Sequence, residues 1–336
     1  MVIDQRKAGA STSVTSSDYF SCDRWQQWTS QSGKYTVQRS STAPTGFVNS
    51  MLATSSSAYA VLTGDYFAFS QQIEGNNVAD LAWGTASAAT VTLSFWVRSS
   101  LTGTFGGAVS NSAVTRSYPF SYTITSANTY EQKTITIAGD TSGTWLTDTG
   151  IGFRVWFGFG VGATYSGTAG SWAGADYRSA TGATSVVGTN GATFYITGVQ
   201  LEKGSTATSF DYRPFGTELM LCQRYYCKTF NTSTAPAQNT GSYDGSFMAV
   251  SINAAANTGL VINWQFPSEM RAAPSITTYC PFAANANWYS PAGPTTSTTV
   301  SVYPISTRCT TIYNANAPAI GADANYYIQA SAAAEL

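Results

Sequence analysis

The chain has 336 residues, no histidine and only 10% charged residues, and its 16 basic and 17 acidic side chains give a net charge of −1. The lack of histidine excludes Ser-His-Asp and Cys-His catalysis and histidine zinc sites. Hydrophobic residues at 43% and aromatic residues at 14% are too abundant for a disordered chain. Ser, Thr, Gly and Ala therefore replace charged residues at the surface, which suits an extracellular or particle-bound β protein.

The charge pattern and the hydropathy exclude two classes of partner. The longest basic cluster is the pair Arg6-Lys7, whereas a nucleic-acid binder needs a basic stripe. We expect no membrane insertion, because Gly, Ser and Thr interrupt the uncharged stretches. The first residues, MVIDQRKAGASTSV, lack the apolar core of a signal peptide. We therefore expect the protein to reach the exterior as part of a particle that is released by lysis.

The first predicted element in chain order is an extended N-terminal arm, residues 1–17. This segment is rich in Ser and Thr and carries too few apolar residues for a core of its own. We expect neighbouring subunits to hold it and other virion proteins to contact it.

Residues 18–213 are predicted to form a β-sandwich of the jelly-roll type. In Thr90–Arg98, Val91 and Phe95 alternate with polar residues, the period-two pattern of a half-buried strand. The glycine-rich stretches Gly158–Gly174 and Gly182–Gly191 are expected to be long surface loops. Further strands are expected at Tyr118–Thr125, Gln132–Ile137, Ile151–Phe157 and Phe194–Val199.

A domain boundary is placed near Pro214, where proline and glycine end the preceding strand. Residues 214–336 repeat the alternation and are predicted to form a second β-sandwich, so the fold class is all-β with two sandwiches in tandem. Its strands are expected at Phe247–Ile252, Leu260–Phe266, Ser275–Tyr279, Thr299–Tyr303 and Tyr326–Ala330.

The five cysteines do not have the spacing of a metal site. Cys222 and Cys227 form one close pair, but a zinc ribbon needs a second pair, which is absent. Packing in a core is the favoured interpretation, and a bridge between Cys222 and Cys227 is left open. No cofactor is expected, and a structural calcium ion with oxygen ligands is left open.

The segment FYITGVQLEKGSTATSFDYRPFGTELMLCQRYYC, residues 194–227, resembles a segment of phage tail-fibre and related virion proteins. Members of that family carry a jelly roll similar to a carbohydrate-binding module, and Thr197–Gly204 resembles its closing strand. The resemblance implies a virion fibre or appendage, often a homotrimer. It defines no ligand-binding residues.

Aromatic and charged residues in polar loops are the candidate ligand-binding groups, because flat rings stack on sugars and polar groups reach their hydroxyls. Trp96 and Trp156 are instead expected to serve packing. The candidates are Trp172, Asp176, Tyr177, Arg178, Tyr243, Asp244, Trp288 and Tyr289.

The sequence does not predict an enzyme. A glycosidase needs two carboxylates at a set separation, and the available ones, including Glu74, Glu131, Asp140 and Asp148, have no readable spacing. The favoured function is that of a trimeric tail fibre that attaches to host surface polysaccharide. The alternatives are a head fibre or capsid decoration protein with a structural role, and a polysaccharide-degrading tailspike.

Overall fold

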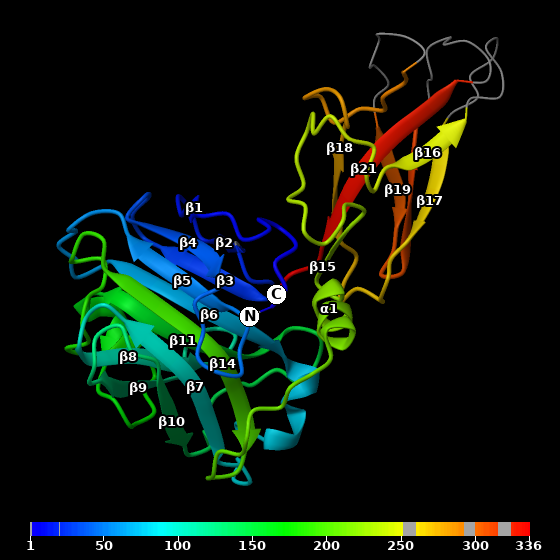
Figure 1. Ribbon diagram of the computed structural model, residues 1–336. Helices are drawn as coiled ribbons and strands as arrows, with labels where there is room; N and C mark the ends of the chain where they lie inside the picture. The colour runs from blue at the N-terminus through cyan, green and yellow to red at the C-terminus, as the bar shows by residue number, and fades with distance from the viewer. Residues whose placement is uncertain (1, 20, 251–259, 292–299, 315–323) are drawn as a thin grey trace. The chain divides into compact units, whose positions relative to one another are not determined.

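The computed structural model describes residues 2–19, 21–250, 260–291, 300–314 and 324–336 (Figure 1). It confirms the all-β prediction, with one α-helix, α1 (Phe215–Gln223), in those ranges. The chain divides into two compact units, residues 1–213 with Leu336 and residues 214–335. Met1 of the predicted arm, Ser251–Ile252 and Thr299 of two predicted strands lie outside the described residues.

The first unit is a jelly roll of two six-stranded antiparallel sheets, as predicted. Sheet A has the order β1-β4-β5-β14-β7-β10, and sheet B has the order β2-β3-β6-β11-β8-β9. The strands of sheet A are β1 (Thr12–Ser13), β4 (Tyr35–Ser40), β5 (Ser50–Ser55), β14 (Thr193–Lys203), β7 (Val91–Ser99) and β10 (Glu131–Ile137). Those of sheet B are β2 (Asp18–Tyr19), β3 (Trp25–Thr29), β6 (Tyr66–Glu74), β11 (Ile151–Val161), β8 (Gly103–Ser110) and β9 (Ser117–Ile124).

The alternation of apolar and polar residues explains how the two sheets pack. In β7, the side chains of Val91, Leu93, Phe95 and Val97 are fully buried between the sheets, while Trp96 lies on the outer face. Aromatic rings from both sheets fill the core, so the hydrophobic effect holds the two layers together.

Residues 2–17 belong to the first sandwich. Val14 is fully buried, Ile3 is almost fully buried, and Thr12–Ser13 pair with β4. Asp23 accepts hydrogen bonds from the backbone and the side chain of Gln5. The expectation that this segment is an extended arm outside the jelly roll is thus corrected, because its few apolar side chains suffice to dock it on the sandwich. Contacts with other subunits stay a prediction.

Part of the glycine-rich stretch Gly158–Gly174 is packed rather than a free surface loop, which corrects the sequence interpretation there, whereas Gly182–Gly191 is an irregular and largely exposed loop, as predicted. The strand β11 continues through Gly158 to Val161, and β12 (Ser166–Gly167) pairs in parallel with β13 (Ser179–Ala180). Ser179 lies very close to sheet B. A Cβ atom placed on Gly158 would lie 2.9 Å from the Cβ atom of Ser179. The glycines of sheet B therefore allow the segment to lie directly on the sheet.

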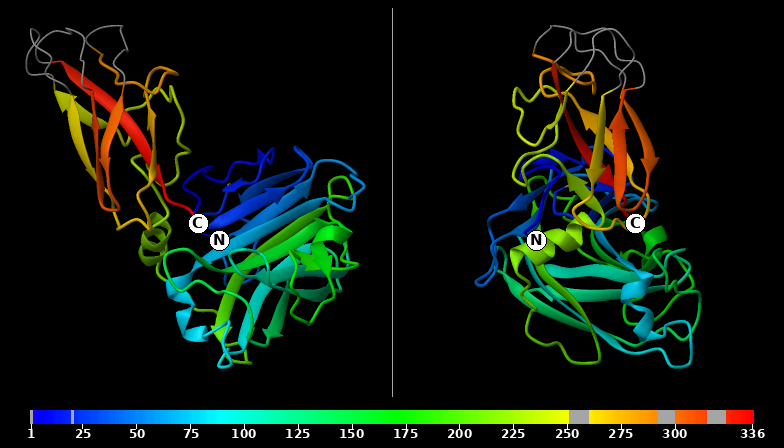
Figure 2. Two further views of the ribbon diagram at one scale, coloured as in Figure 1. Left: turned by 180° about the vertical axis from the view of Figure 1, so that it is seen from behind. Right: turned by 90° about the vertical axis from the view of Figure 1, so that its right-hand side faces the viewer.

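The second unit is a smaller β-sandwich. In its first sheet, β21 pairs with β15, β16 and β18, and in the second the order is β17-β20-β19 (Figure 2). The side chains of Trp264, Trp288, Ile312 and Ile328 lie in its core. Its strands are β15 (Tyr226–Lys228), β16 (Phe247–Val250), β17 (Val261–Gln265), β18 (Ser275–Tyr279), β19 (Ser301–Ile305), β20 (Cys309–Tyr313) and β21 (Asn325–Ala333).

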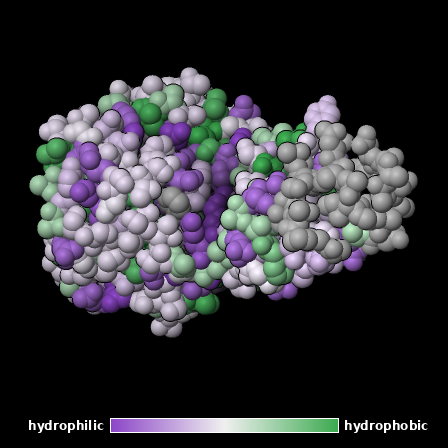
Figure 3. All heavy atoms as spheres, turned by 90° about the horizontal axis from the view of Figure 1, so that it is seen from above, coloured by the Kyte–Doolittle hydropathy of each residue, from purple (hydrophilic) through white to green (hydrophobic). Residues whose placement is uncertain are grey.

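The surface reflects the unusual composition. Figure 3 shows wide pale areas of intermediate hydropathy with scattered hydrophilic and hydrophobic groups. Such areas fit a surface built from Ser, Thr, Gly and Ala with few charges.

Candidate functional site

Arg178 is a buried cation on the outer face of sheet B. Its side chain makes two hydrogen bonds to Asp176, at 3.1 and 2.8 Å, and only 8% of the residue is exposed. Its guanidinium carbon lies 4.1 Å from the ring centre of Tyr66 and 4.6 Å from that of Tyr165. Trp28 and Trp156 complete the aromatic surroundings. Planar guanidinium groups stack on rings in this way at low cost of desolvation.

The arginine fixes the segment that carries it. Burial alone would lower the pKa of Arg178, but the hydrogen bonds and the charge of Asp176 outweigh burial and raise that pKa. The ring of Tyr177 fills the space beside Gly167, where a Cβ atom would lie 2.2 Å from it. This geometry favours packing for Asp176, Tyr177 and Arg178, whose predicted role in ligand binding stays untested.

Trp172 belongs to a different cluster, formed by loops of the first unit. Its ring centre lies 5.3 Å from that of Trp83 and 5.6 Å from that of Trp145. Its Nε1 donates a hydrogen bond to the carbonyl oxygen of Ala138 at 2.8 Å, and Arg116 lies against its ring. The structure therefore does not bring Trp172 together with Arg178.

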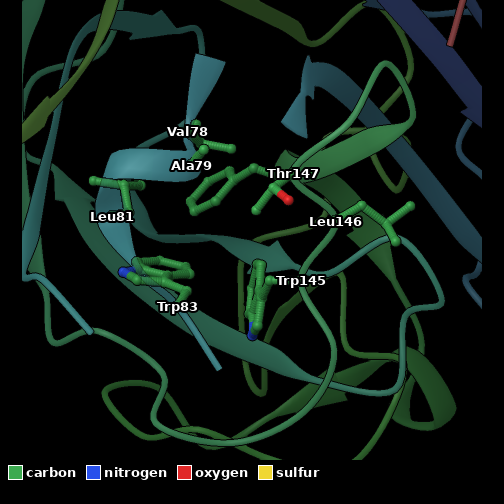
Figure 4. A pocket seen from close by; sticks show the side chains of 9 residues that line it. Val78, Ala79, Leu81, Trp83, Trp145, Leu146 and Thr147 are labelled. Atoms are coloured by element: carbon green, nitrogen blue, oxygen red, sulfur yellow. The ribbon is translucent and has the colours of Figure 1, made fainter. Parts of the chain in front are cut away.

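A shallow pocket with a volume of only about 10 Å³ lies beside this tryptophan cluster. Figure 4 shows Trp83 and Trp145 at the pocket, with Val78 and Leu81 on the neighbouring short helical turns. The lining is apolar apart from Thr147, whereas ligand sites combine an apolar wall with several convergent polar groups. The pocket thus lacks the polar groups that would orient a sugar.

The second unit presents an aromatic platform formed by Tyr243, Phe282, Tyr289 and Tyr327. The ring centre of Tyr243 lies 4.7 Å from that of Phe282 and 4.4 Å from that of Tyr327. Phe282 and Tyr289 are 4.7 Å apart and inclined by only 32°. Tyr243 is 40% exposed, and the other three rings are half-buried. Ring faces and tyrosine hydroxyls are thus available to solvent at one place.

Backbone and side-chain hydrogen bonds hold the platform. Tyr289 and Tyr327 exchange two backbone hydrogen bonds, at 3.0 and 2.8 Å. The buried amide of Gln329 donates to the carbonyl oxygen of Asp244 at 2.7 Å, which anchors the turn that carries Tyr243. Asp244, the residue after Tyr243, is itself exposed. The rings are therefore preorganised.

The hydroxyl group of Tyr243 stays protonated over the physiological range. Partial desolvation raises the pKa of Tyr243, and the charge and hydrogen bond of Tyr289 raise it further. A neutral phenol both donates and accepts hydrogen bonds, which matches the hydroxyl groups of a sugar.

Trp288 is not part of this surface, although the sequence analysis grouped it with Tyr289. Only 1% of Trp288 is exposed, and it packs in the core of the second unit. Successive side chains of an extended segment point to opposite sides, so burial of Trp288 leaves Tyr289 facing outward. The prediction of Trp288 as an exposed ligand-binding residue is therefore wrong.

Sequence reasoning missed Phe282 and Tyr327. The strand around Tyr326 and Tyr327 gives one usable signal, because alternation places one tyrosine inside and its neighbour outside. Phe282 lies in an irregular segment, where no periodicity reveals its orientation.

The carboxylates considered for glycosidase chemistry are engaged elsewhere. Asp140 makes a bidentate pair with Arg116, at 2.8 and 2.7 Å. Desolvation alone would raise the pKa of Glu131, but hydrogen bonds from Lys133 and the turn at Thr125–Ser126 lower it to about 2. A general acid needs a raised pKa, so Glu131 is unsuited to that role.

Three further observations concern metals, thiols and membranes. Within the described ranges, no three Cys, Asp or Glu side chains come together as a metal site. All five cysteines lie in described segments and none forms a disulfide. Burial raises the pKa of Cys22 and of Cys227 to about 12, so both thiols stay protonated.

The described part of the chain contains no helix with the length and hydropathy of a membrane span.

No protein-family model and no curated protein matches this chain. Similar solved structures include the enzymatically active domain of tailspike protein 4 from Bacteriophage CBA120, with 12% identity, TM-score 0.32, and coverage of 54% of this chain and 19% of that one. A putative sugar binding protein from Bacteroides thetaiotaomicron has 12% identity, TM-score 0.35, and coverage of 60% and 100%. The family 11 carbohydrate-binding module of a Clostridium thermocellum cellulase has 13% identity, TM-score 0.30, and coverage of 60% and 99%. The chain thus spans about a fifth of the tailspike, and likeness at this level assigns no function.

Proposed function

We propose that the protein binds carbohydrate through the aromatic platform, without cleaving it, as a component of a phage virion appendage. The observation that carries the binding proposal is the group of solvent-accessible rings around Tyr243, which the exposed residue Asp244 follows in the chain. The resemblance of residues 194–227 to tail-fibre proteins supports the assignment to a virion appendage.

The chemistry of the platform matches that of a sugar. The C–H face of a pyranose stacks on an aromatic ring, while its hydroxyls pair with the phenols of Tyr243 and Tyr289 and with Asp244. Each contact is weak, so firm attachment needs several copies. A homotrimer repeated over several appendages supplies that avidity.

The first prediction concerns the most exposed ring of the platform. Replacing Tyr243 with alanine removes a stacking surface worth about 1 kcal/mol, which corresponds to an affinity about fivefold lower for each site. Tyr243→Phe keeps the ring and loses only the hydroxyl, so it should bind more tightly than the alanine variant. Isothermal titration of the whole chain with purified host surface polysaccharide measures both.

The stability of the variant serves as the control. Because Tyr243 is exposed, its replacement should leave thermal unfolding nearly unchanged. Equal affinity of Tyr243→Ala and wild-type protein for the polysaccharide would contradict binding at the platform. Release of new reducing ends during the titration would contradict binding without cleavage and favour a polysaccharide-degrading tailspike.

A structural role in the particle is the second candidate, because the second unit also exposes apolar side chains. Tyr303 is 72% exposed, Val261 60% and Met248 52%. Contact between copies of the chain would cover such groups. Light scattering distinguishes a trimer from a monomer of 35.5 kDa. Particles that fall apart without this chain yet still adsorb to the host would favour a head fibre or decoration protein.

A further inference from the structure

The outer face of sheet A carries a row of side chains that the proposed platform does not involve. The strand register places Tyr195 opposite Arg98 on one side and opposite Leu52 on the other, and Leu52 opposite Gln38. Glu131 lies opposite Val97 in an antiparallel pair of strands. Tyr130, one residue before Glu131, therefore lies beside Arg98, one residue after Val97, and belongs to the same row. Residues that lie directly opposite each other on paired strands have their side chains on the same face of the sheet. The row crosses five strands, and four strand spacings of about 4.8 Å give it a length of roughly 19 Å.

Arg98 is the charged centre of this row. Its guanidinium carbon lies 4.8 Å from the ring centre of Tyr195 and 5.9 Å from that of Tyr130. Its Nε donates a hydrogen bond to the carbonyl oxygen of Asn128 at 2.9 Å, which orients the planar group. The side chain is half-buried, so it is held in place while part of it contacts solvent.

Arg98 has no acidic partner among the residues that the structure describes, in contrast to three other arginines. Arg116, Arg178 and Arg308 each form an ion pair with a carboxylate, at 2.7, 2.8 and 2.9 Å. The nearby Glu131 is paired with Lys133 at 2.6 Å. The two terminal nitrogens of Arg98 are thus available for an external anion.

The rings that flank Arg98 are fixed. The hydroxyl of Tyr130 donates to the carbonyl oxygen of Thr42 at 2.7 Å and lies 3.0 Å from the hydroxyl oxygen of Ser50. The ring centres of Tyr130 and Tyr195 are 6.2 Å apart. A ligand would therefore meet a preorganised surface and would not have to order these side chains.

We propose that this row is a second binding site, specific for an acidic saccharide such as a uronic-acid polymer. A planar arginine fork binds a carboxylate through two parallel hydrogen bonds, a geometry that a neutral sugar cannot use. The carboxylate pairs with Arg98 while the ring of the sugar packs on Tyr195. The half-buried amide of Gln38 lies further along the same row and offers both donors and an acceptor to hydroxyl groups.

The experiment compares two probes on the whole chain, oligogalacturonate and its methyl ester, by isothermal titration. The ester keeps the sugar backbone and loses the negative charge. Wild-type protein should bind the acid about tenfold or more tightly than the ester, and salt should weaken binding of the acid. This comparison needs no variant and so does not depend on folding of a mutant.

Variants then locate the site. Arg98→Gln should bring the affinity for oligogalacturonate down about tenfold, to that for the ester, while Arg98→Lys should lie in between because it keeps the charge but not the fork. Tyr243→Ala, in the second unit, should leave the preference for the acid over the ester unchanged, because the platform does not distinguish the two by charge. That variant separates failure of this site from failure of the platform.

Three outcomes would overturn the proposal. The first is equal binding, or no binding, of acid and ester by wild-type protein. The second is binding of the acid that Arg98→Gln leaves unchanged. The third is a change of oligomeric mass in Arg98→Gln, measured by light scattering, which would identify the row as a contact between copies of the chain.

Discussion

Replacing Trp288 with alanine is expected to destabilise the second unit by about 3–5 kcal/mol, the usual cost of removing a fully buried tryptophan. Such a loss lowers the melting temperature of a unit of this size by roughly 12–20 °C. Domains have only about 5–15 kcal/mol of stability, so the variant is close to unfolding. Calorimetry of the whole chain measures this fall in melting temperature if the two units melt separately. The melting temperature of the first unit should stay the same.

Two neighbouring variants provide the controls for Trp288. Trp288→Phe keeps most of the apolar volume. The Nε1 atom of Trp288 has no hydrogen-bond acceptor among the described residues, so this variant loses no hydrogen bond to them and should lose much less stability. Tyr289→Ala removes a half-buried ring of the platform and should cost less stability than Trp288→Ala. An unchanged melting temperature for Trp288→Ala would show that the core does not depend on this ring.

The contrast between Trp288 and Tyr289 shows where sequence reasoning ends. Alternation revealed the fold class and the inward residues of β7, because period two is a property of the strand itself. The short segment around Trp288 contains no such repeat. Its two aromatic residues look equivalent in sequence, and only packing of the second sandwich decides which one is buried.

The strands that sequence analysis did not identify have a similar explanation. In β3, two glutamines separate Trp25 from Trp28, which breaks the period-two alternation, and β8 is rich in Gly, whose lack of a side chain gives little hydrophobic signal. They form because neighbouring strands supply hydrogen bonds and because the docked segment around Ser179 needs small residues beneath it. Tertiary contacts thus override weak local preferences.

Polar loop composition did not reveal that Arg178 is buried. A charged residue next to tyrosine in a glycine-rich segment is typical of a binding loop, yet the same groups also form a buried contact. Arg98 lies inside a regular strand and lacks an acidic partner in the described part of the chain, which the sequence does not indicate. Only the arrangement of neighbouring strands distinguishes the two cases.

Replacing Arg178 with alanine should destabilise the first unit by about 3 kcal/mol. Breaking a buried ion pair costs about 3–5 kcal/mol, and the lower end applies because the side chain of Asp176 keeps 27% of its surface exposed. The loss has two sources: Asp176 is left without its cation, and a cavity opens among Trp28, Tyr66 and Tyr165. For a unit of about 200 residues, the melting temperature should fall by roughly 6–12 °C.

Arg178→Lys is the matched control, because it keeps the positive charge but cannot form the planar fork or stack on several rings. Its melting temperature should lie between those of the wild type and Arg178→Ala. Binding of polysaccharide at the platform should be the same in all three proteins when measured well below their melting temperatures. Unchanged stability of Arg178→Ala, together with a loss of polysaccharide binding, would instead identify Arg178 as a ligand-binding residue, and the segment around it as part of the recognition surface.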